Sequence, residues 1–288
     1  MGSARAPVVA LIAVVVALVL PGSATAAGDQ TAKVVGHRGG FLSSKAPQNS
    51  YAAFAWLSAR GHAIEGDARM TRDGRFVMFH DPGIGRTCTG KKRNRIERMT
   101  YRQVMRMRCH DGRRLTTLHQ VLSLLRTRPG STLWLESKHR HGQSRRKAIA
   151  QNRLMARSVR AAGVSRRVIF QDRKPSLLPA FRSEIPGART AYLLFTRPTA
   201  LHVARAVSLR AGVLSYRAAY SSPGINRLAA ERGLHVHNWV ARTPEQAAAL
   251  LAAGAHSVSA DDPVMLVARW PRPPAPPEDP APPAPTTP

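Results

Sequence analysis

Short β-type segments alternate with segments of helical apolar spacing along most of this 288-residue chain, and that alternation constrains the fold more than any other feature. The predicted strands are Lys33–Gly36, Ala63–Asp67, Thr132–Ser137, Val168–Gln171, Thr190–Phe195, Gly212–Tyr216, His235–Val240 and Ser257–Asp261. The clearest predicted helices are Tyr51–Ser58, Leu118–Leu125, Ala148–Ala162, Ile225–Arg232 and Pro244–Ala253. This pattern predicts one α/β domain over residues 33–270, a (β/α)8 TIM barrel, with an open doubly wound sheet as the alternative.

One segment breaks the alternation. After Asp67 there is no room for a helix before the next β-like run, Phe76–His80, and Asp73-Gly74 between them is a tight-turn signal. We expect the chain to leave the barrel mouth after Asp67, turn, and return as an antiparallel arm. His80 would then lie near the carboxylates at the end of the preceding strand.

An irregular basic insertion follows the arm, at about residues 82–116, and carries the only two cysteines, Cys88 and Cys109. An isolated pair in an exported chain is more often bridged than free. A loop of about 20 residues closed by a disulfide stabilises a fold by roughly 3 kcal/mol on the chain-entropy model. We therefore predict a small disulfide-pinned insertion beside the active site.

The two ends of the chain have their own signatures. Arg5, an apolar run over residues 8–20 and Ala24-Thr25-Ala26 predict a signal peptide at 1–26, too short to span a membrane. Residues 271–288 are rich in proline and alanine, which predicts a disordered tail. We expect a secreted, extracellular protein with no stable membrane insertion.

The formal net charge of +28 indicates attraction to anionic partners, such as phosphate-bearing substrates, teichoic-acid-type polymers or lipid surfaces. Nucleic acid is not predicted as a partner, because the arginines are scattered through every segment instead of lying on one helix with interleaved aromatic residues. A general preference for arginine in the composition explains the charge equally well.

Among the 16 acidic residues, three lie at strand ends: Glu65, Asp67 and Glu136. Most others occupy turns, tails or predicted helices, where charges are solvated, as Glu97 does. Residues two apart on a strand share a face, so Glu65 and Asp67 converge, and Glu136 can join them from a neighbouring strand. Three crowded carboxylates favour one divalent cation, Ca²⁺ or Mg²⁺. The alternative is that one of the abundant arginines neutralises each of them.

Two histidines accompany the carboxylates. His37 follows the first strand and His80 ends the returning arm, so both are predicted at the same rim as an acid–base pair for phosphoester cleavage. His235 and His237 could face either way. Three further histidines, in loops or basic runs, are predicted to be surface residues: His110, His139 and His141.

Two basic side chains complete the predicted site. Arg38 adjoins His37, and Lys138 lies two residues after Glu136, so both could bind non-bridging phosphate oxygens. In so basic a chain, either could instead be an ordinary surface charge.

These residues together resemble the glycerophosphodiester phosphodiesterase family, a group of barrels of the phospholipase-C-like phosphodiesterase type. The matching motifs are His37-Arg38-Gly39, Pro47-Gln48-Asn49-Ser50, Glu65-Gly66-Asp67, Thr71-Arg72-Asp73-Gly74 with Phe79-His80-Asp81, Glu136-Ser137-Lys138, Trp239-Val240 and Ala260-Asp261-Asp262-Pro263. The resemblance implies a metal on the three carboxylates, acid–base catalysis by the two histidines, phosphate contacts from Arg38 and Lys138, and Trp239 lining the glycerol or alcohol side. Two departures concern substrate contacts: Gln48 stands where the family usually has glutamate, and Phe170-Gln171-Asp172 replaces a more typical Ser-Phe pair.

The resemblance implies hydrolysis of small glycerophosphodiesters to sn-glycerol 3-phosphate and an alcohol, by attack of water or of the substrate's own 2-hydroxyl. One alternative is a sphingomyelinase D-like phospholipase, which shares the barrel, the paired histidines and the Glu-x-Asp carboxylates. Another is a catalytically silent binder of anionic wall polymer, which the net charge of +28 would favour.

Overall fold

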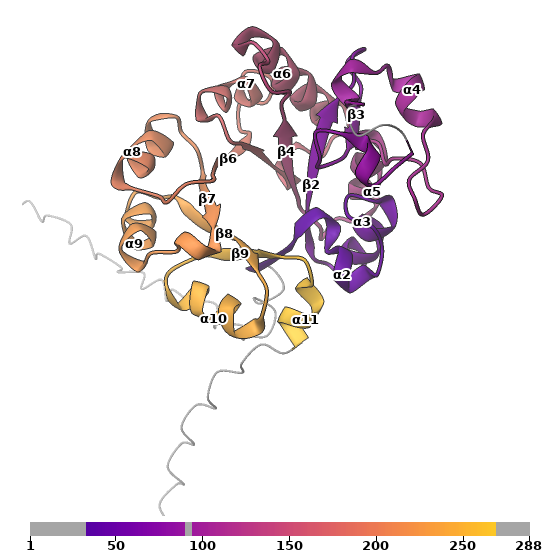
Figure 1. Cartoon of the computed structure of the whole chain (residues 1–288). Coiled ribbons are helices and arrows are strands. Elements are labelled where there is room, and N and C mark those ends of the chain that lie inside the picture. The colour runs from indigo at the N-terminus through magenta and orange to yellow at the C-terminus, as the bar shows by residue number, and fades with distance from the viewer. Residues whose placement is uncertain (1–32, 90–93, 269–288) are drawn as a thin grey trace, which may run out of the picture.

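The computed structural model describes residues 33–89 and 94–268, and in that part of the chain eight parallel strands close into a barrel (Figure 1). The barrel strands are β1 (Val34–Gly36), β2 (Ala63–Met70), β4 (Leu133–Lys138), β5 (Val168–Asp172), β6 (Arg189–Leu194), β7 (Val213–Arg217), β8 (His235–Ala241) and β9 (Ser257–Ala260). β1 pairs with both β2 and β9, which closes the ring. The predicted barrel is confirmed, and the open doubly wound sheet is wrong.

Helices surround the ring of strands on the outside (Figure 1). They are α2 (Phe41–Ser44), α3 (Tyr51–Ser58), α5 (Leu118–Thr127), α6 (Arg145–Ala161), α7 (Pro179–Arg182), α8 (Ala200–Ser208), α9 (Pro223–Glu231), α10 (Pro244–Ala252) and α11 (Pro263–Ala268). Local sequence sets the ends of several helices. The hydroxyl of Thr243 accepts a hydrogen bond from the Gln246 amide at the start of α10, and Gly163 adopts φ 71° just after α6.

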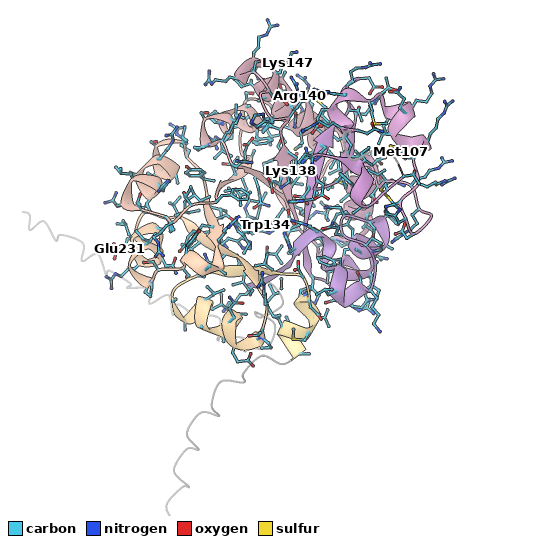
Figure 2. The ribbon with its side chains drawn as sticks, in the orientation of Figure 1. Met107, Trp134, Lys138, Arg140, Lys147 and Glu231 are labelled. Atoms are coloured by element: carbon cyan, nitrogen blue, oxygen red, sulfur yellow. A yellow bond between two sulfur atoms is a disulfide. The ribbon has the colours of Figure 1, made fainter. Side chains whose placement is uncertain are left out.

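Apolar side chains fill both sides of the barrel wall. Outside it, Phe170 of β5 stacks on Phe181 of α7 with ring centroids 4.5 Å apart. Inside it, small and branched residues surround Trp134 and form a plug: Val35, Ala63, Ile169, Ala191 and Val213. Figure 2 shows Trp134 and Lys138 inside the ring of strands. The barrel is therefore a packed core with an open mouth.

Two histidines of β8 belong to this interior. The ring of His237 lies 4.3 Å from that of Trp134, and its Nδ1 and Nε2 lie 2.8 and 2.9 Å from the hydroxyls of Ser257 and Ser259. Nε2 of His235 lies 2.7 Å from the Ser257 hydroxyl. Both side chains therefore point inward, which resolves the orientation that the sequence leaves open.

The expected antiparallel arm is present. β3 (Phe76–Met78) pairs antiparallel with the end of β2, after a turn in which Gly74 adopts φ 79°. The Phe79 amide donates a hydrogen bond of 2.8 Å to the carbonyl of Asp67, so the arm returns to the level of the carboxylates. His80 follows directly.

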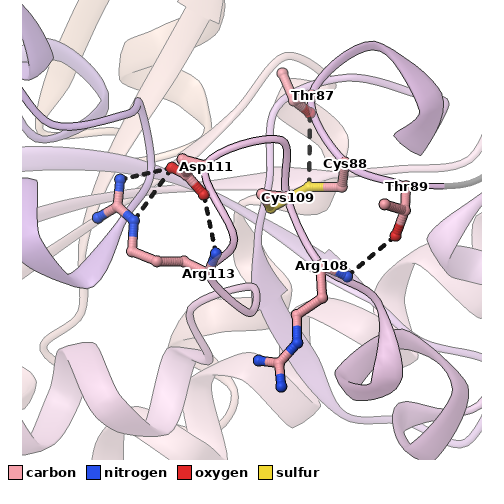
Figure 3. Close-up of a disulfide and its surroundings, with 7 residues drawn as sticks. All are labelled: Thr87, Cys88, Thr89, Arg108, Cys109, Asp111 and Arg113. Carbon is pink, nitrogen blue, oxygen red and sulfur yellow. Dashed lines mark hydrogen bonds and ion pairs between the residues drawn. A yellow bond between two sulfur atoms is a disulfide. The ribbon is translucent and has the colours of Figure 1, made fainter.

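The insertion after the arm packs Ile84, Ile96, Val104 and Leu115 against Val77 of β3 in a small hydrophobic cluster separate from the main core. It is more ordered than the sequence predicts, because it contains helix α4 (Tyr101–Arg106) and the 3-10 turns η2 (Ile84–Arg86) and η3 (Ile96–Arg98). Its disulfide joins Cys88 to Cys109 across a pair of antiparallel segments (Figure 3).

The predicted signal peptide, 1–26, and the predicted tail, 271–288, lie outside the described residues. Within 33–89 and 94–268, no helix combines the length and apolar character needed to cross a membrane. The prediction of secretion therefore stays a prediction.

Candidate active site and metal centre

Three carboxylates meet at the barrel mouth. Glu65 and Asp67 share the inner face of β2, and Glu136 of β4 stands directly opposite Asp67 in the strand register. One oxygen from each of the three lies within 4.8 Å of the others, and all three residues are at most 5% exposed. The structure thus brings together the three residues predicted as metal ligands.

Basic side chains compensate part of this negative charge, but the nearest of them is a lysine and not the arginines of the alternative prediction. The ammonium of Lys138 lies 3.0 Å from Oδ1 of Asp67 and 2.7 Å from Oε2 of Glu136. Nε of Arg38 lies 3.6 Å from Oδ2 of Asp67. Even so, Oε1 of Glu136 is buried without a hydrogen-bond partner among the described residues. A buried, unpartnered carboxylate oxygen in an all-oxygen cluster fits a hard divalent cation.

The three carboxylates do not titrate alike. Burial and the charge of Asp67 raise the pKa of Glu65 to about 7, although the Arg38 amide donates to its Oε2 at 2.8 Å. Burial also raises the pKa of Glu136, against the charge of Lys138. For Asp67, burial is outweighed by Lys138, His80 and Arg38, which hold its pKa well below the usual range. Burial thus disfavours the charged forms of Glu65 and Glu136, an effect that a bound cation would oppose.

Asn49 fixes the position of the central carboxylate. Its Nδ2 donates to Oδ2 of Asp67 at 2.8 Å, and its Oδ1 accepts from the Asp67 amide at 3.0 Å. Asn49 is not among the predicted site residues, although it lies in the Pro47-Gln48-Asn49-Ser50 motif. Its φ of 57° places it in the left-handed region, which asparagine tolerates better than most residues.

His37 lies on a 3-10 turn just after β1, with its Nδ1 2.6 Å from Oδ1 of Asp261. Burial alone would lower the pKa of His37, but the hydrogen bond to Asp261 and the charge of Glu65 outweigh it and raise the pKa above its usual value. Asp261 is also not a predicted site residue. The signal that could have identified it is its place at the end of the last predicted strand.

His80 faces the same cavity from the returning arm. Its Nδ1 lies 2.9 Å from Oδ1 of Asp81, and the Arg69 guanidinium donates to its carbonyl oxygen at 2.5 and 3.2 Å. Burial lowers the pKa of His80, and the charges of Lys138 and Arg38 add to this effect, while Asp67 opposes it. The two histidine pKa values thus shift in opposite directions, an arrangement suited to an acid–base pair.

A cavity of about 250 Å³ connects these groups. Its lining includes both histidines, the three carboxylates, Arg38, Lys138 and Trp239. Phe195 and Arg217 also line it, with the Phe195 ring edge-on to Trp239 at 5.0 Å and the Arg217 guanidinium 5.6 Å from the Trp239 ring. The predicted site residues therefore share one pocket, with an aromatic and basic wall that the sequence does not reveal.

The Gln48 departure has a visible effect. Oε1 of Gln48 accepts a hydrogen bond of 2.6 Å from Nη1 of Arg38. A glutamate there would pair its charge with the guanidinium. The amide oxygen accepts this hydrogen bond without a charge of its own, which leaves more of the Arg38 charge for an anion in the cavity.

Two predictions about charged groups are wrong. The side chain of His139, predicted at the surface, is 5% exposed, with Nε2 2.8 Å from Oδ2 of Asp172. Glu97, predicted to be solvated, is 8% exposed and pairs with Nη1 of Arg69 at 2.5 Å. In each case the side chain is buried against a partner that is distant in the sequence. The pattern of neighbouring residues does not indicate such a partner.

Comparisons with known proteins identify the family of this chain. The model of the "Glycerophosphoryl diester phosphodiesterase family" matches residues 37–265. A curated Mycobacterium tuberculosis relative, "Probable glycerophosphodiester phosphodiesterase 2", is 35% identical over 94 residues, which are 31% of this chain and 33% of that protein. The curated relatives are matched over less than half of their own length.

Solved structures match over nearly their whole length. A glycerophosphodiester phosphodiesterase from Parabacteroides distasonis superposes with a TM-score of 0.72 at 20% identity, covering 82% of this chain and 95% of that one. An Oleispira antarctica phosphodiesterase in complex with the product sn-glycerol-3-phosphate gives 0.70 at 18% identity, covering 84% and 98%. At such identities the likeness shows a shared fold.

Proposed function

Because the chain belongs to the glycerophosphoryl diester phosphodiesterase family, we propose that it is a phosphoric diester hydrolase that converts glycerophosphodiesters to sn-glycerol 3-phosphate and an alcohol. The observation that carries the proposal is the meeting of His37, His80 and the carboxylate triad in one cavity of about 250 Å³. A relative of the same fold holds sn-glycerol-3-phosphate as product, which supports this substrate class.

The two histidines exchange the protons of the reaction. One ring takes the proton of the attacking oxygen, and the other donates a proton to the leaving alkoxide. Attack by water gives sn-glycerol 3-phosphate directly, whereas attack by the glycerol 2-hydroxyl gives a cyclic phosphate that a water molecule then opens to the same product. Asp261 orients His37 through the 2.6 Å contact at Nδ1, and Asp81 orients His80 through the 2.9 Å contact. Each ring thus keeps Nε2 for the reaction.

Glu65, Asp67 and Glu136 would hold the divalent cation, Ca²⁺ or Mg²⁺. When bound, the cation would offset negative charge on the phosphate oxygens. Arg38 and Lys138 line the same cavity and place further positive charge beside the phosphate. The buried indole N–H of Trp239 has no hydrogen-bond partner within the described part of the chain, and together with the ring face it suits a polyol hydroxyl and carbon chain.

The direct test is turnover of glycerophosphocholine and glycerophosphoethanolamine by the purified protein, with added Ca²⁺ or Mg²⁺ and with EDTA. We expect cation-dependent release of sn-glycerol 3-phosphate, lost in His37→Ala and retained in His119→Ala, a matched exposed histidine on α5. Faster turnover of lysophosphatidylcholine or sphingomyelin would indicate the sphingomyelinase D-like alternative. Polymer binding without hydrolysis of any diester would indicate a silent binder.

We also propose that the protein acts outside the cytoplasm. The pairing of Cys88 with Cys109 supports this, since disulfides persist in oxidising compartments. Recovery of the processed chain from the medium of its expression host, with both thiols blocked to alkylation, is the expected result. Retention in the cytoplasm with free thiols would contradict it.

A further inference from the structure

A second cavity, of about 560 Å³, adjoins the catalytic pocket. The two share four lining residues, namely His80, Glu136, Lys138 and Phe195. The two cavities are therefore neighbours that meet at these four side chains. The hydrolysis proposed above needs a single phosphate, so this additional space has no part in it.

The lining of the second cavity is strongly cationic. Besides Lys138 and three histidines, its basic side chains are Arg69, Arg95, Arg140, Arg173 and Lys174. Glu136 is the one acidic side chain among the described residues that line it. Arg69 is occupied by Glu97, but none of the ion pairs formed by the described residues uses Arg140, Arg173 or Lys174. The second cavity is therefore lined in part by basic side chains whose charge no ion pair of the described residues offsets.

The loop between β4 and α6 provides the centre of this lining. Figure 2 shows Arg140 on that loop, farther from the barrel centre than Lys138. Arg173 approaches from the loop after β5, with its guanidinium 5.1 Å from the Phe195 ring. The ring of Phe195 is shared by both cavities, so Arg173 stands at the boundary between them.

His139 is a buried part of this lining. Its side chain is 5% exposed, and Nε2 is held 2.8 Å from Oδ2 of Asp172. Asp172 is itself fixed by Nδ2 of Asn152 and by the Lys174 amide, each at 2.8 Å. Nδ1 of His139, however, has no hydrogen-bond partner among the described residues. This unpartnered ring nitrogen, on a side chain that lines the cavity, is a candidate contact for a phosphate oxygen.

We propose that the second cavity binds a further phosphate carried by the alcohol part of the substrate. The preferred substrates are then phosphodiesters whose alcohol continues into another phosphate, as in a chain of glycerol phosphate units. This proposal rests on the proposed function, because it places the cleaved diester at His37 and His80. Guanidinium groups, which can donate two parallel hydrogen bonds, and a buried histidine suit a phosphate better than a neutral sugar or a choline cation.

The test compares glycerophosphoglycerol, with one phosphodiester, and the homologue one glycerol phosphate unit longer. The variant is Arg140→Gln/Arg173→Gln, and the control is Arg205→Gln/Arg227→Gln, which removes the same charge from exposed positions on α8 and α9. We expect kcat/KM for the longer substrate to fall about tenfold in the variant, with less than a twofold change for the shorter one. His139→Asn should show the same selectivity.

Equal losses on both substrates, or none on either, would overturn the second-phosphate subsite and leave the proposed function intact. If no diester is hydrolysed at all, the proposed function fails, and calorimetry still decides the subsite. The longer compound should bind the wild type more tightly than glycerophosphoglycerol does, with the difference lost in Arg140→Gln/Arg173→Gln and kept in the control. Equal binding of both compounds would overturn the proposal.

Discussion

Nδ1 of His37 lies 2.6 Å from Oδ1 of Asp261, a residue 224 positions later in the chain. The contact fixes the tautomer and the direction of the His37 ring, so that Nε2 faces the cavity. It also raises the pKa of His37 against the effect of burial. The carboxylate of Asp261, just after β9, thus influences both the orientation of the His37 ring and its pKa.

Replacing this carboxylate by an amide should slow catalysis with little effect on the fold. We expect Asp261→Asn to lower kcat on the order of 100-fold, because His37 loses its orienting anion. The pKa assigned to His37 in the pH–rate profile should also fall. Asp262→Asn is the matched control, since Asp262 accepts from the Met265 amide in α11. Equal kcat values for the two variants would contradict this role of Asp261.

Removal of one proposed metal ligand should abolish cation binding. Ca²⁺ or Mg²⁺ should raise the unfolding temperature of the wild type, since a ligand at 100 times its Kd adds about 2.7 kcal/mol of stability. Glu136→Gln should lose this shift together with activity, and Glu231→Gln, an exposed change on α9, should keep both. Equal shifts in the wild type and Glu136→Gln would show that the cation binds elsewhere.

The parts of the site that could be predicted lie on regular strands. Glu65 and Asp67 alternate on β2, and Glu136 is in register with Asp67, so strand period and parallel pairing bring them together. The antiparallel arm follows from the missing helix and the Asp73-Gly74 turn. Such features depend on local backbone geometry, which the sequence encodes directly.

The remainder depends on contacts between distant segments. Nothing near His139 in the sequence indicates that Asp172, 33 residues later, will bury and orient it. The contact between Asp261 and His37 is likewise not indicated by the local sequence. Nor is the ion pair with Arg69 that buries the Glu97 side chain. In each case the partner becomes evident only once the order and register of the strands are known.

Acid should destabilise the fold through the barrel interior. Burial lowers the pKa of His235 to about 4 from 6.5, with His256 and Arg189 adding to the effect, so the unfolded chain binds more protons between these values. Stability therefore falls as the pH drops through that window, by about 3 kcal/mol for this residue. The pKa of His237 is also lowered well below its usual value by burial.

Urea unfolding at pH 7 and pH 4.5 measures this loss. His235→Gln should reduce the difference between the two pH values, because glutamine does not titrate. His119→Gln, at an exposed position, should leave the difference unchanged. A wild type equally stable at both pH values would contradict the prediction.

Loss of the disulfide should weaken the insertion and spare the barrel. The bridge spans 21 positions, so the chain-entropy model predicts that Cys88→Ser/Cys109→Ser lowers the free energy of unfolding by about 3 kcal/mol. Limited proteolysis of the variant should cut within residues 82–116 first. Dithiothreitol should destabilise the wild type to the level of the variant and leave the variant unchanged. An unaltered wild type would argue against the bridge.

The closure of the barrel by β1 and β9 has a consequence for biogenesis. Among the described residues, His37 follows the first barrel strand, β1, whereas Asp261 directly follows the last one, β9. A nascent chain can complete neither the ring nor this histidine–carboxylate pair until almost the whole domain has been translated. Catalytic competence should therefore arise at a single late step and not grow with chain length.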